Sequence, residues 1–143
     1  MVRIVIDTNV LVSSSLAKGP SFIIVNEIAA DVKNIEVCLS EDVLSEYRNL
    51  FYYERISRKY PKFTDNISIG ISKLEKGGIL YFPTRNFNLL SDVTDNKFLN
   101  LAFEAKANYL ITGNHRDFTI TAFHQTKILN PKTFCELYEQ NKL

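Results

Sequence analysis

This sequence of 143 residues has only two cysteines, two histidines, five glycines and four prolines, and these scarcities exclude several classes of protein. Cys38 and Cys135 lie far apart, so they form no disulfide framework, and the Cys and His residues lack the spacing of a zinc site. We expect both cysteines to be reduced, buried thiols. The few glycines form neither of the common glycine-rich phosphate-binding motifs.

The sequence also lacks an excess of one charge and a long apolar run. Its 17 basic and 16 acidic side chains give a net charge of +1, so any contact with nucleic acid must be local. No apolar stretch approaches the roughly 18 residues that cross a bilayer, and the N-terminal residues do not show the pattern of a signal peptide. We therefore expect a soluble, cytoplasmic protein that has no membrane partner.

The chain has the length of one domain, residues 1–143, with a single core. Short apolar runs that favour β-strands alternate with segments whose apolar residues recur at helical spacing. The runs are Arg3–Ile6, Ile35–Leu39, Ile79–Phe82, Tyr109–Thr112 and Lys127–Leu129. Because the runs are apolar nearly throughout, they indicate a parallel sheet covered on both faces, and the sequence predicts the α/β class.

Helix starts are predicted from capping residues and proline. The predicted starts are Gly19-Pro20, Ser40, Thr64, Asp95 and Asn130-Pro131. The helix after Thr64 is expected to stop at Gly77-Gly78, and the helix after Asp95 to run to about Ala107.

Four acidic residues stand where a parallel sheet places its binding sites, which is beyond the carboxyl ends of the strands. Asp7 follows the first predicted strand, and Asp117 lies in the loop after the fourth. Asp95 begins a helix, and Glu46 borders the apolar stripe of the helix after Ser40. Taken singly, each position also suits an ordinary turn, a helix cap or a solvated helix flank.

Carboxylates gathered in one cleft repel each other unless a cation lies between them. A set of oxygen ligands selects a hard ion such as Mg²⁺ or Mn²⁺ rather than zinc. One or two such ions, about 4 Å apart if there are two, activate water and stabilise the charge that develops on a phosphodiester. The four acids together therefore predict hydrolytic nuclease chemistry.

Four segments of the sequence resemble the PIN domain family, close to the VapC-like toxins of prokaryotic toxin–antitoxin pairs. The segments are VIDTNVLVSS, LSEDVLSEYRNL, SDVTDNKFLNLAFEAKANYLITGNHRDF and KILNPKTF, in this order over nearly the whole chain. The resemblance implies a three-layer α/β/α sandwich with a five-stranded parallel sheet. It also implies an endoribonuclease that depends on Mg²⁺ or Mn²⁺ and leaves a 5′-phosphate and a 3′-hydroxyl.

The resemblance assigns the catalytic and metal-binding roles to Asp7, Glu46, Asp95 and Asp117. Many relatives carry Asp where this sequence has Asn114, and others carry Asn there with the acid three residues later, so either Asn114 or Asp117 completes the site. The side chains expected to hold the carboxylates in place are Thr8, Asn9, Ser13, Asn96 and Asn114. Ordinary hydrogen bonding in turns and caps is the alternative for these residues.

Residues 52–62, YYERISRKYPK, interleave tyrosines with basic residues, a pattern that suits single-stranded RNA. A charged helix end with partly buried tyrosines, or a surface for an antitoxin or a second chain, explains the same pattern. The predicted RNA-binding residues are Arg55, Arg58, Lys59, Lys97 and Arg116. The resemblance implies an RNA substrate, an antitoxin protein and a homodimer as partners.

Two other classes of protein place an Asp after a first strand, but this sequence lacks the further residues that each of them requires. Phosphohydrolases of the haloacid-dehalogenase kind need an acid two residues on, where this sequence has Asn9. Receiver domains need adjacent acids after the first strand and an Asp after the third, where Pro83 and Thr84 stand. A non-catalytic PIN-like interaction module and a housekeeping RNA-processing nuclease remain as alternatives.

Overall fold

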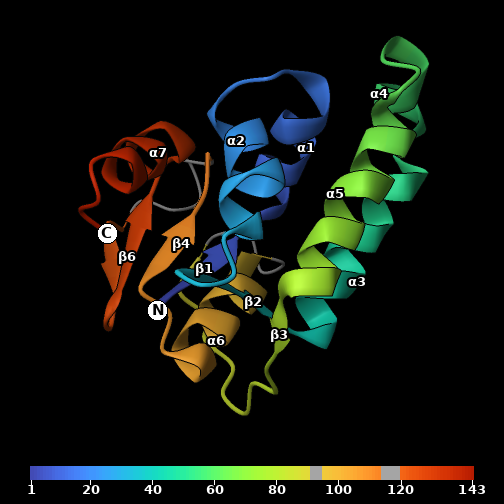
Figure 1. Cartoon of the computed structure of the whole chain (residues 1–143). Coiled ribbons are helices and arrows are strands. Elements are labelled where there is room, and N and C mark those ends of the chain that lie inside the picture. The colour runs from blue at the N-terminus through green and yellow to red at the C-terminus, as the bar shows by residue number, and fades with distance from the viewer. Residues whose placement is uncertain (91–94, 114–119) are drawn as a thin grey trace.

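A sheet of six strands forms the centre of the computed structural model, which describes residues 1–90, 95–113 and 120–143 (Figure 1). The strands are β1 (Val2–Ile6), β2 (Ile35–Leu39), β3 (Ile79–Leu80), β4 (Tyr109–Ile111), β5 (Ala122–Phe123) and β6 (Thr126–Leu129). Their order across the sheet is β3-β2-β1-β4-β6-β5. All five predicted strand segments are therefore present, with one strand that was not predicted.

The expectation of a five-stranded parallel sheet is wrong, because β5 makes the sheet mixed. Strands β3, β2, β1, β4 and β6 run parallel, whereas β5 pairs antiparallel with β6. The chain reverses between Phe123 and Thr126, where His124 has a φ of 53°. A two-residue hairpin turn requires such positive φ values, and the usual sequence signal for it is Asn-Gly or Asp-Gly. His124-Gln125 carries no such signal, so the hairpin was missed.

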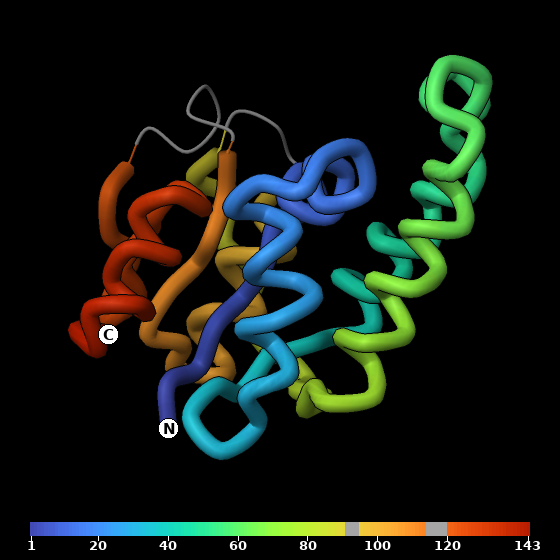
Figure 2. The backbone as a smooth tube through the Cα atoms, turned by 45° about the horizontal axis from the view of Figure 1, so that its top comes forward, coloured from blue at the N-terminus to red at the C-terminus, as the bar shows by residue number. Residues whose placement is uncertain are grey.

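Helices cover both faces of the sheet, with α1, α2 and α7 on one face and α6 on the other (Figures 1 and 2). The helices are α1 (Thr8–Leu16), α2 (Pro20–Asn26), α3 (Glu41–Asn49), α4 (Glu54–Lys59), α5 (Phe63–Gly77), α6 (Asn96–Ala105) and α7 (Pro131–Glu139). Short 3₁₀ turns, η1 (Ile28–Ala30) and η2 (Leu50–Tyr52), follow α2 and α3. The prediction of an α/β fold with helices on a sheet is confirmed.

Two of the predicted caps form and one does not. The Ser40 hydroxyl accepts a hydrogen bond from the Val43 N–H at 3.2 Å, and the Asn130 side chain accepts one from the Thr133 N–H at 2.8 Å. Both contacts satisfy N–H groups that have no partner within the helix. Thr64 is not a cap, because it lies inside α5, which begins at Phe63.

Helix α1 was not predicted, because its sequence has no amphipathic pattern. Its buried face mixes apolar Val10 and Leu11 with polar Ser14 and Ser15, whereas Leu16 is exposed. The hydroxyls of Ser14 and Ser15 both donate to the Leu11 carbonyl, at 2.7 and 3.0 Å, which satisfies them inside the protein. Serine can therefore occupy the buried face here, and with Leu16 exposed the apolar residues show no helical periodicity.

Helices α3, α4 and α5 form an arm, residues 41–77, that stands beside the sheet edge and extends past the body of the molecule (Figure 2). The base of the arm is anchored by buried side chains such as Tyr47, Ile67 and Leu74. Helix α4, at the far end, contributes no buried residue. The arm is therefore well packed at its base and exposed at its end.

Both cysteines are buried and unpaired, as predicted. Among the residues that the structure describes, no helix combines the length and the apolar character that a membrane crossing requires.

Candidate functional site

The winding of the sheet reverses between β1 and β4. From β1 the chain continues to β2 and β3 on one side, and then crosses to β4 and β6 on the other. Such a switch point opens a crevice at the carboxyl ends of the two central strands. Asp7 follows β1 and Thr112 follows β4, and the Asp7 N–H donates to the Ile111 carbonyl at 2.9 Å. The fold thus places Asp7 at the position where open parallel sheets bind ligands.

The Asp7 carboxyl is almost fully buried, with 3% of its surface exposed. The Thr112 hydroxyl donates to Asp7 Oδ2 at 2.6 Å. The Asn9 amide bridges to the same strand end, because its Nδ2 donates to Thr112 Oγ1 at 3.3 Å and its Oδ1 accepts from the Gly113 N–H at 3.0 Å. Burial of a carboxylate is costly unless polar partners compensate it. These contacts hold the Asp7 carboxylate at the rim of the sheet.

Thr112 is a site residue that the sequence reasoning missed. It was read as the last residue of an apolar strand, a place where Thr is common because it favours β-structure. The signal that could have identified Thr112 was its position, because a hydroxyl at the carboxyl end of a central strand lies beside the end of the neighbouring strand. That neighbour is known only from the strand order, so the pairing with Asp7 was not visible in the sequence.

Thr8 and Ser13, both predicted to support the carboxylates, occupy different environments on α1. The Thr8 hydroxyl is buried and has no hydrogen-bond partner among the described residues. Ser13 is exposed. An unpartnered buried hydroxyl is unfavourable for folding, and this one belongs to the residue that follows Asp7.

Glu46 lies on the flank of α3, half-buried as the helical projection predicted, and it faces α6. Its Oε2 accepts a hydrogen bond from Lys97 Nζ at 2.9 Å, and the two side chains are 20% and 23% exposed. The adjacent Tyr47 is fully buried and its hydroxyl donates to the Ile6 carbonyl, directly before Asp7. Burial, and to a smaller degree the charge of Asp7, raises the pKa of Tyr47 well above its ordinary value, so Tyr47 is a neutral donor.

Asp95 and Asn96 lie where α6 begins. Asp95 occupies the residue before the helix and is half-buried. The buried Asn96 side chain accepts hydrogen bonds from the Leu89 and Leu90 N–H groups, at 3.1 and 3.0 Å. Asn96 therefore fixes the start of α6 against residues 89 and 90. This structural role differs from the predicted one, in which Asn96 helps to hold the carboxylates.

Two tertiary contacts of α3 draw the acid-bearing segments together. Tyr47 joins α3 to the end of β1, which carries Asp7, and Glu46 joins α3 to the first turn of α6, which follows Asp95. Both contacts lie within one residue of a predicted ligand on α3. The carboxyl end of β1, the middle of α3 and the start of α6 therefore meet at one rim of the sheet.

Within residues 1–90, 95–113 and 120–143, no three His, Cys, Asp or Glu side chains lie close enough together to hold a metal ion. The predicted residues Asn114, Arg116 and Asp117 lie outside these ranges. The described residues supply a buried carboxylate, an unpartnered hydroxyl and oxygen donors, which suit a hard cation. They do not form a complete ligand set by themselves, and Asp117 is the predicted residue that would extend it.

The predicted RNA-binding residues divide into two groups. Lys97 lies at the rim, where its charge is paired with Glu46. Arg55, Arg58 and Lys59 are exposed on α4 at the end of the arm. These three residues therefore lie on a different element from the carboxylates.

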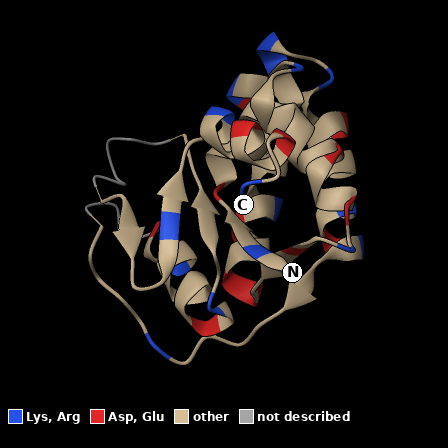
Figure 3. Cartoon of the chain, turned by 60° about the vertical axis from the view of Figure 1, so that its left-hand side comes forward, with Lys and Arg blue, Asp and Glu red and all other residues tan. Residues whose placement is uncertain are grey.

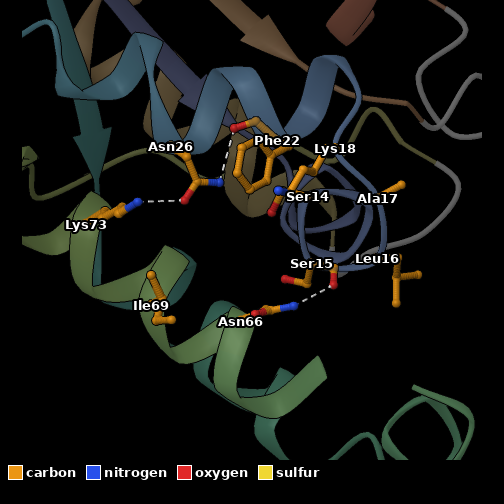
Figure 4. Close-up of a pocket in the computed structure, with 10 residues that line it drawn as sticks. All are labelled: Ser14, Ser15, Leu16, Ala17, Lys18, Phe22, Asn26, Asn66, Ile69 and Lys73. Carbon is orange, nitrogen blue, oxygen red and sulfur yellow. Dashed lines mark hydrogen bonds between the residues drawn. The ribbon is translucent and has the colours of Figure 1, made fainter. Parts of the chain in front are cut away.

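A cavity of about 380 Å³ lies between α1, α2 and α5 (Figure 4). Its polar groups are engaged within the protein: Lys73 Nζ donates to Asn26 Oδ1 at 2.9 Å, and Asn66 Nδ2 donates to the Ser15 carbonyl at 3.1 Å. It is lined by the end of α1, whereas Asp7 precedes the start of that helix. This cavity is therefore separate from the carboxylate site.

A family model described as PIN domain matches residues 3–116 of this chain. The uncharacterized protein MJ1680 of Methanocaldococcus jannaschii is also similar, with 26% identity over 156 aligned positions that cover 97% of this chain and 93% of that protein. The matched family region contains Asp7, Glu46 and Asp95 and ends one residue before Asp117.

Proposed function

Because this chain belongs to the PIN domain family, whose members are generally nucleases, we propose that it is an endoribonuclease that depends on Mg²⁺ or Mn²⁺. The observation that carries the proposal is the buried Asp7 carboxylate at the switch point of the sheet, held by the Thr112 hydroxyl at 2.6 Å. A buried carboxylate disfavours folding unless it is compensated, so its position at a ligand-binding rim supports a functional role.

In this proposal Asp7, Glu46, Asp95 and Asp117 would hold one or two ions, and Asn114 is the alternative to Asp117. Because Asp7, Glu46 and Asp95 do not converge closely enough by themselves, binding would have to draw their side chains together. A bound metal would supply activation of water and compensation of the negative charge that develops on the phosphodiester. Thr112 and Asn9 keep the Asp7 carboxylate in a fixed position, and Thr8 offers a hydroxyl beside it. Lys97 holds the Glu46 carboxylate toward α6.

The proposal is tested with purified protein and a labelled single-stranded RNA, with Mg²⁺, with Mn²⁺ and with EDTA. We expect cleavage only with metal, and Asp7→Asn to lower the rate at least about 100-fold, because a neutral amide binds a hard cation poorly. Asp65→Asn is the matched control, since Asp65 is an exposed acid on α5. Circular dichroism confirms that both variants are folded.

A second readout does not depend on cleavage. Mn²⁺ that binds only the folded protein raises its melting temperature, and this rise should be present in the wild type and Asp65→Asn and absent in Asp7→Asn. Equal cleavage by Asp7→Asn, or cleavage that persists in EDTA, would overturn the proposal. A folded protein that neither cleaves RNA nor responds to metal would favour a non-catalytic PIN-like interaction module.

For the cellular role we propose the toxin of a toxin–antitoxin pair, acting in the cytoplasm as a homodimer. The support is the resemblance to VapC-like toxins in the segments around Asp7, Glu46 and Asp95. A short adjacent gene for a DNA-binding protein is expected, and its co-expression should relieve growth arrest caused by this chain. An isolated gene whose expression does not affect growth would favour an RNA-processing nuclease instead.

A further inference from the structure

We propose that the end of the arm, residues 51–62, binds single-stranded RNA by stacking bases on its tyrosines and neutralising phosphates with its basic residues. We call these residues the tip. The inference rests on the proposed ribonuclease function, and it assigns to the protein an RNA-holding surface separate from the carboxylate site.

The tip concentrates positive charge in a chain that is almost neutral. It carries four basic side chains and one acid, a net charge of +3, whereas the whole chain carries +1, so the remaining residues together carry −2. Figure 3 shows basic residues gathered where the arm ends. The basic residues are Arg55, Arg58, Lys59 and Lys62, all exposed. Phosphate groups are the ligands that such a local cluster attracts.

The tip also exposes aromatic rings that a stable fold would ordinarily bury. Tyr52 is 81% exposed, Tyr53 43% and Tyr60 41%. Helix α4, between Tyr53 and Tyr60, has no buried residue. The expectation of partly buried tyrosines at a charged helix end therefore does not account for Tyr52. Rings next to cations provide stacking faces for unpaired bases, which duplex RNA does not offer.

The basic side chains of the tip form only weak ion pairs within the protein. Arg58 lies 3.7 Å from Glu54 on the same helix, and both side chains are more than 80% exposed. Such exposed pairs contribute little and exchange readily for another anion. Lys59 Nζ lies 5.7 Å from the centre of the Tyr60 ring, an arrangement that brings a charge and a stacking face together.

The carboxylate rim is acidic, so the RNA strand needs a second surface that binds it. Without a bound metal ion, Asp7, Glu46 and Asp95 repel phosphate, and the nearby Lys97 is paired with Glu46. Strand β4 points toward the end of the molecule where α4 lies (Figure 1). From Glu46 to Tyr53 the chain advances seven residues along α3 and η2, or about 10 Å at the rise of a helix. With stacked bases about 3.4 Å apart, a strand held at the rim reaches the tip within about three to five nucleotides.

Binding is measured by fluorescence anisotropy with a labelled 12-nucleotide single-stranded RNA in EDTA, so that no cleavage is required. We expect Tyr52→Ala/Tyr53→Ala to weaken binding at least about fivefold. This is the smallest loss of affinity expected when one base loses its stacking partner. Tyr52→Phe/Tyr53→Phe should retain most of the affinity, whereas Tyr52→Leu/Tyr53→Leu should not, because leucine keeps apolar bulk but has no aromatic face.

The charge contribution is measured through the salt dependence of the same binding. Arg55→Gln/Arg58→Gln/Lys59→Gln should reduce the slope of log affinity against log salt by about 2, since each phosphate contact to a single strand contributes about 0.7. The matched control is Lys33→Gln/Lys127→Gln/Lys132→Gln, which removes the same charge from exposed positions outside the arm. Its slope should change by less than half as much.

Several results would overturn the inference. One is an affinity for RNA that is the same in the wild type and all tip variants; another is an equal loss in the control triple variant. A third is a tip variant that dissociates a dimer, shown by sedimentation, without changing RNA affinity, which would identify the tip as a protein interface. Because the assay needs no catalysis, failure of the tip and failure of the nuclease proposal are distinguishable.

Discussion

At the scale of single residues, the site depends on side chains that are buried and polar at once. Asp7 is held by Thr112, and Thr8 beside it has a hydroxyl that finds no partner among the described residues. Groups of this kind lower the stability of a fold, and sites of binding or catalysis are where proteins retain them. The residue-scale consequence is that Thr112 serves both stability and the position of the Asp7 carboxylate.

Replacement of Thr112 by Val tests this double role. It removes the donor to a buried carboxylate, so we expect a loss of about 1.5–3 kcal/mol in the free energy of unfolding, measured by urea titration. We also expect slower RNA cleavage, because Asp7 then has more freedom to move. Thr126→Val is the matched control: Thr126 is equally buried, and its hydroxyl donates to the Ala107 carbonyl at 2.7 Å, away from the site. It should lower stability with no change in cleavage, and a slower Thr126→Val enzyme would contradict the assignment.

At the scale of elements, α3 organises the site. It begins directly after β2 at the rim, joins the end of β1 through Tyr47, and joins α6 through Glu46 and Lys97. Its N-terminus is capped by Ser40, with Glu41 and Asp42 in the first turn, where negative charge is favourable. Beyond Asn49 the chain continues toward the tip. One helix therefore relates the carboxylate rim to the tip.

The contribution of the Ser40 cap is measurable. Ser40→Ala leaves the Val43 N–H without its partner, and we expect the free energy of unfolding to fall by about 1 kcal/mol. Ser45→Ala, at an exposed position within α3, is the control and should change stability by only a few tenths of a kcal/mol in the favourable direction. Thermal or urea unfolding of both variants measures these changes. Equal changes in the free energy of unfolding would mean that Ser40 does not act as a cap.

At the scale of the whole molecule, the core covers both faces of a sheet whose central strand β1 is buried over its last three residues. Ile4, Val5 and Ile6 of β1 have no exposed surface, and the buried Cys38 lies beside them on β2. Burial raises the pKa of the Cys38 thiol to about 12, and burial with the Glu36 hydrogen bond raises the pKa of Tyr81 to about 12. These groups stay protonated in the folded protein after they have ionised in the unfolded chain.

The raised pKa of Cys38 predicts the direction of alkaline sensitivity. Between the ordinary thiol pKa of 9.0 and the folded pKa of about 12, the folded state binds a proton that the unfolded state has lost. The free energy of unfolding should therefore fall as pH rises from about 9 toward 12, and show no change from this group below pH 8. Urea titrations at pH 8, 9.5 and 10.5 measure this, and Cys38→Ala should show a smaller fall. An equal fall in the variant would exclude the thiol as a cause.

Much of the fold followed from local pattern. Apolar runs located the strands, and Ser40 and Asn130 located helix starts, because these signals are written over a few neighbouring residues. The elements that escaped detection lacked such signals: α1 has serines on its buried face, and the β5–β6 turn uses His124 at positive φ. For the site, the position of Asp7 after the first strand and of Glu46 on a helix flank was predictable. Their partners Thr112 and Lys97 were not.

The sequence by itself determined the α/β class, the strand segments and the family, since composition, periodicity and short motifs are properties of the chain. Only the tertiary structure decided that β1 and β4 are neighbours, that Thr112 holds Asp7, and that Lys97 pairs with Glu46. It also decided that the tip stands exposed rather than packed. The physical reason is distance along the chain: Asp7 and Thr112 are 105 residues apart, and such contacts depend on how whole elements pack.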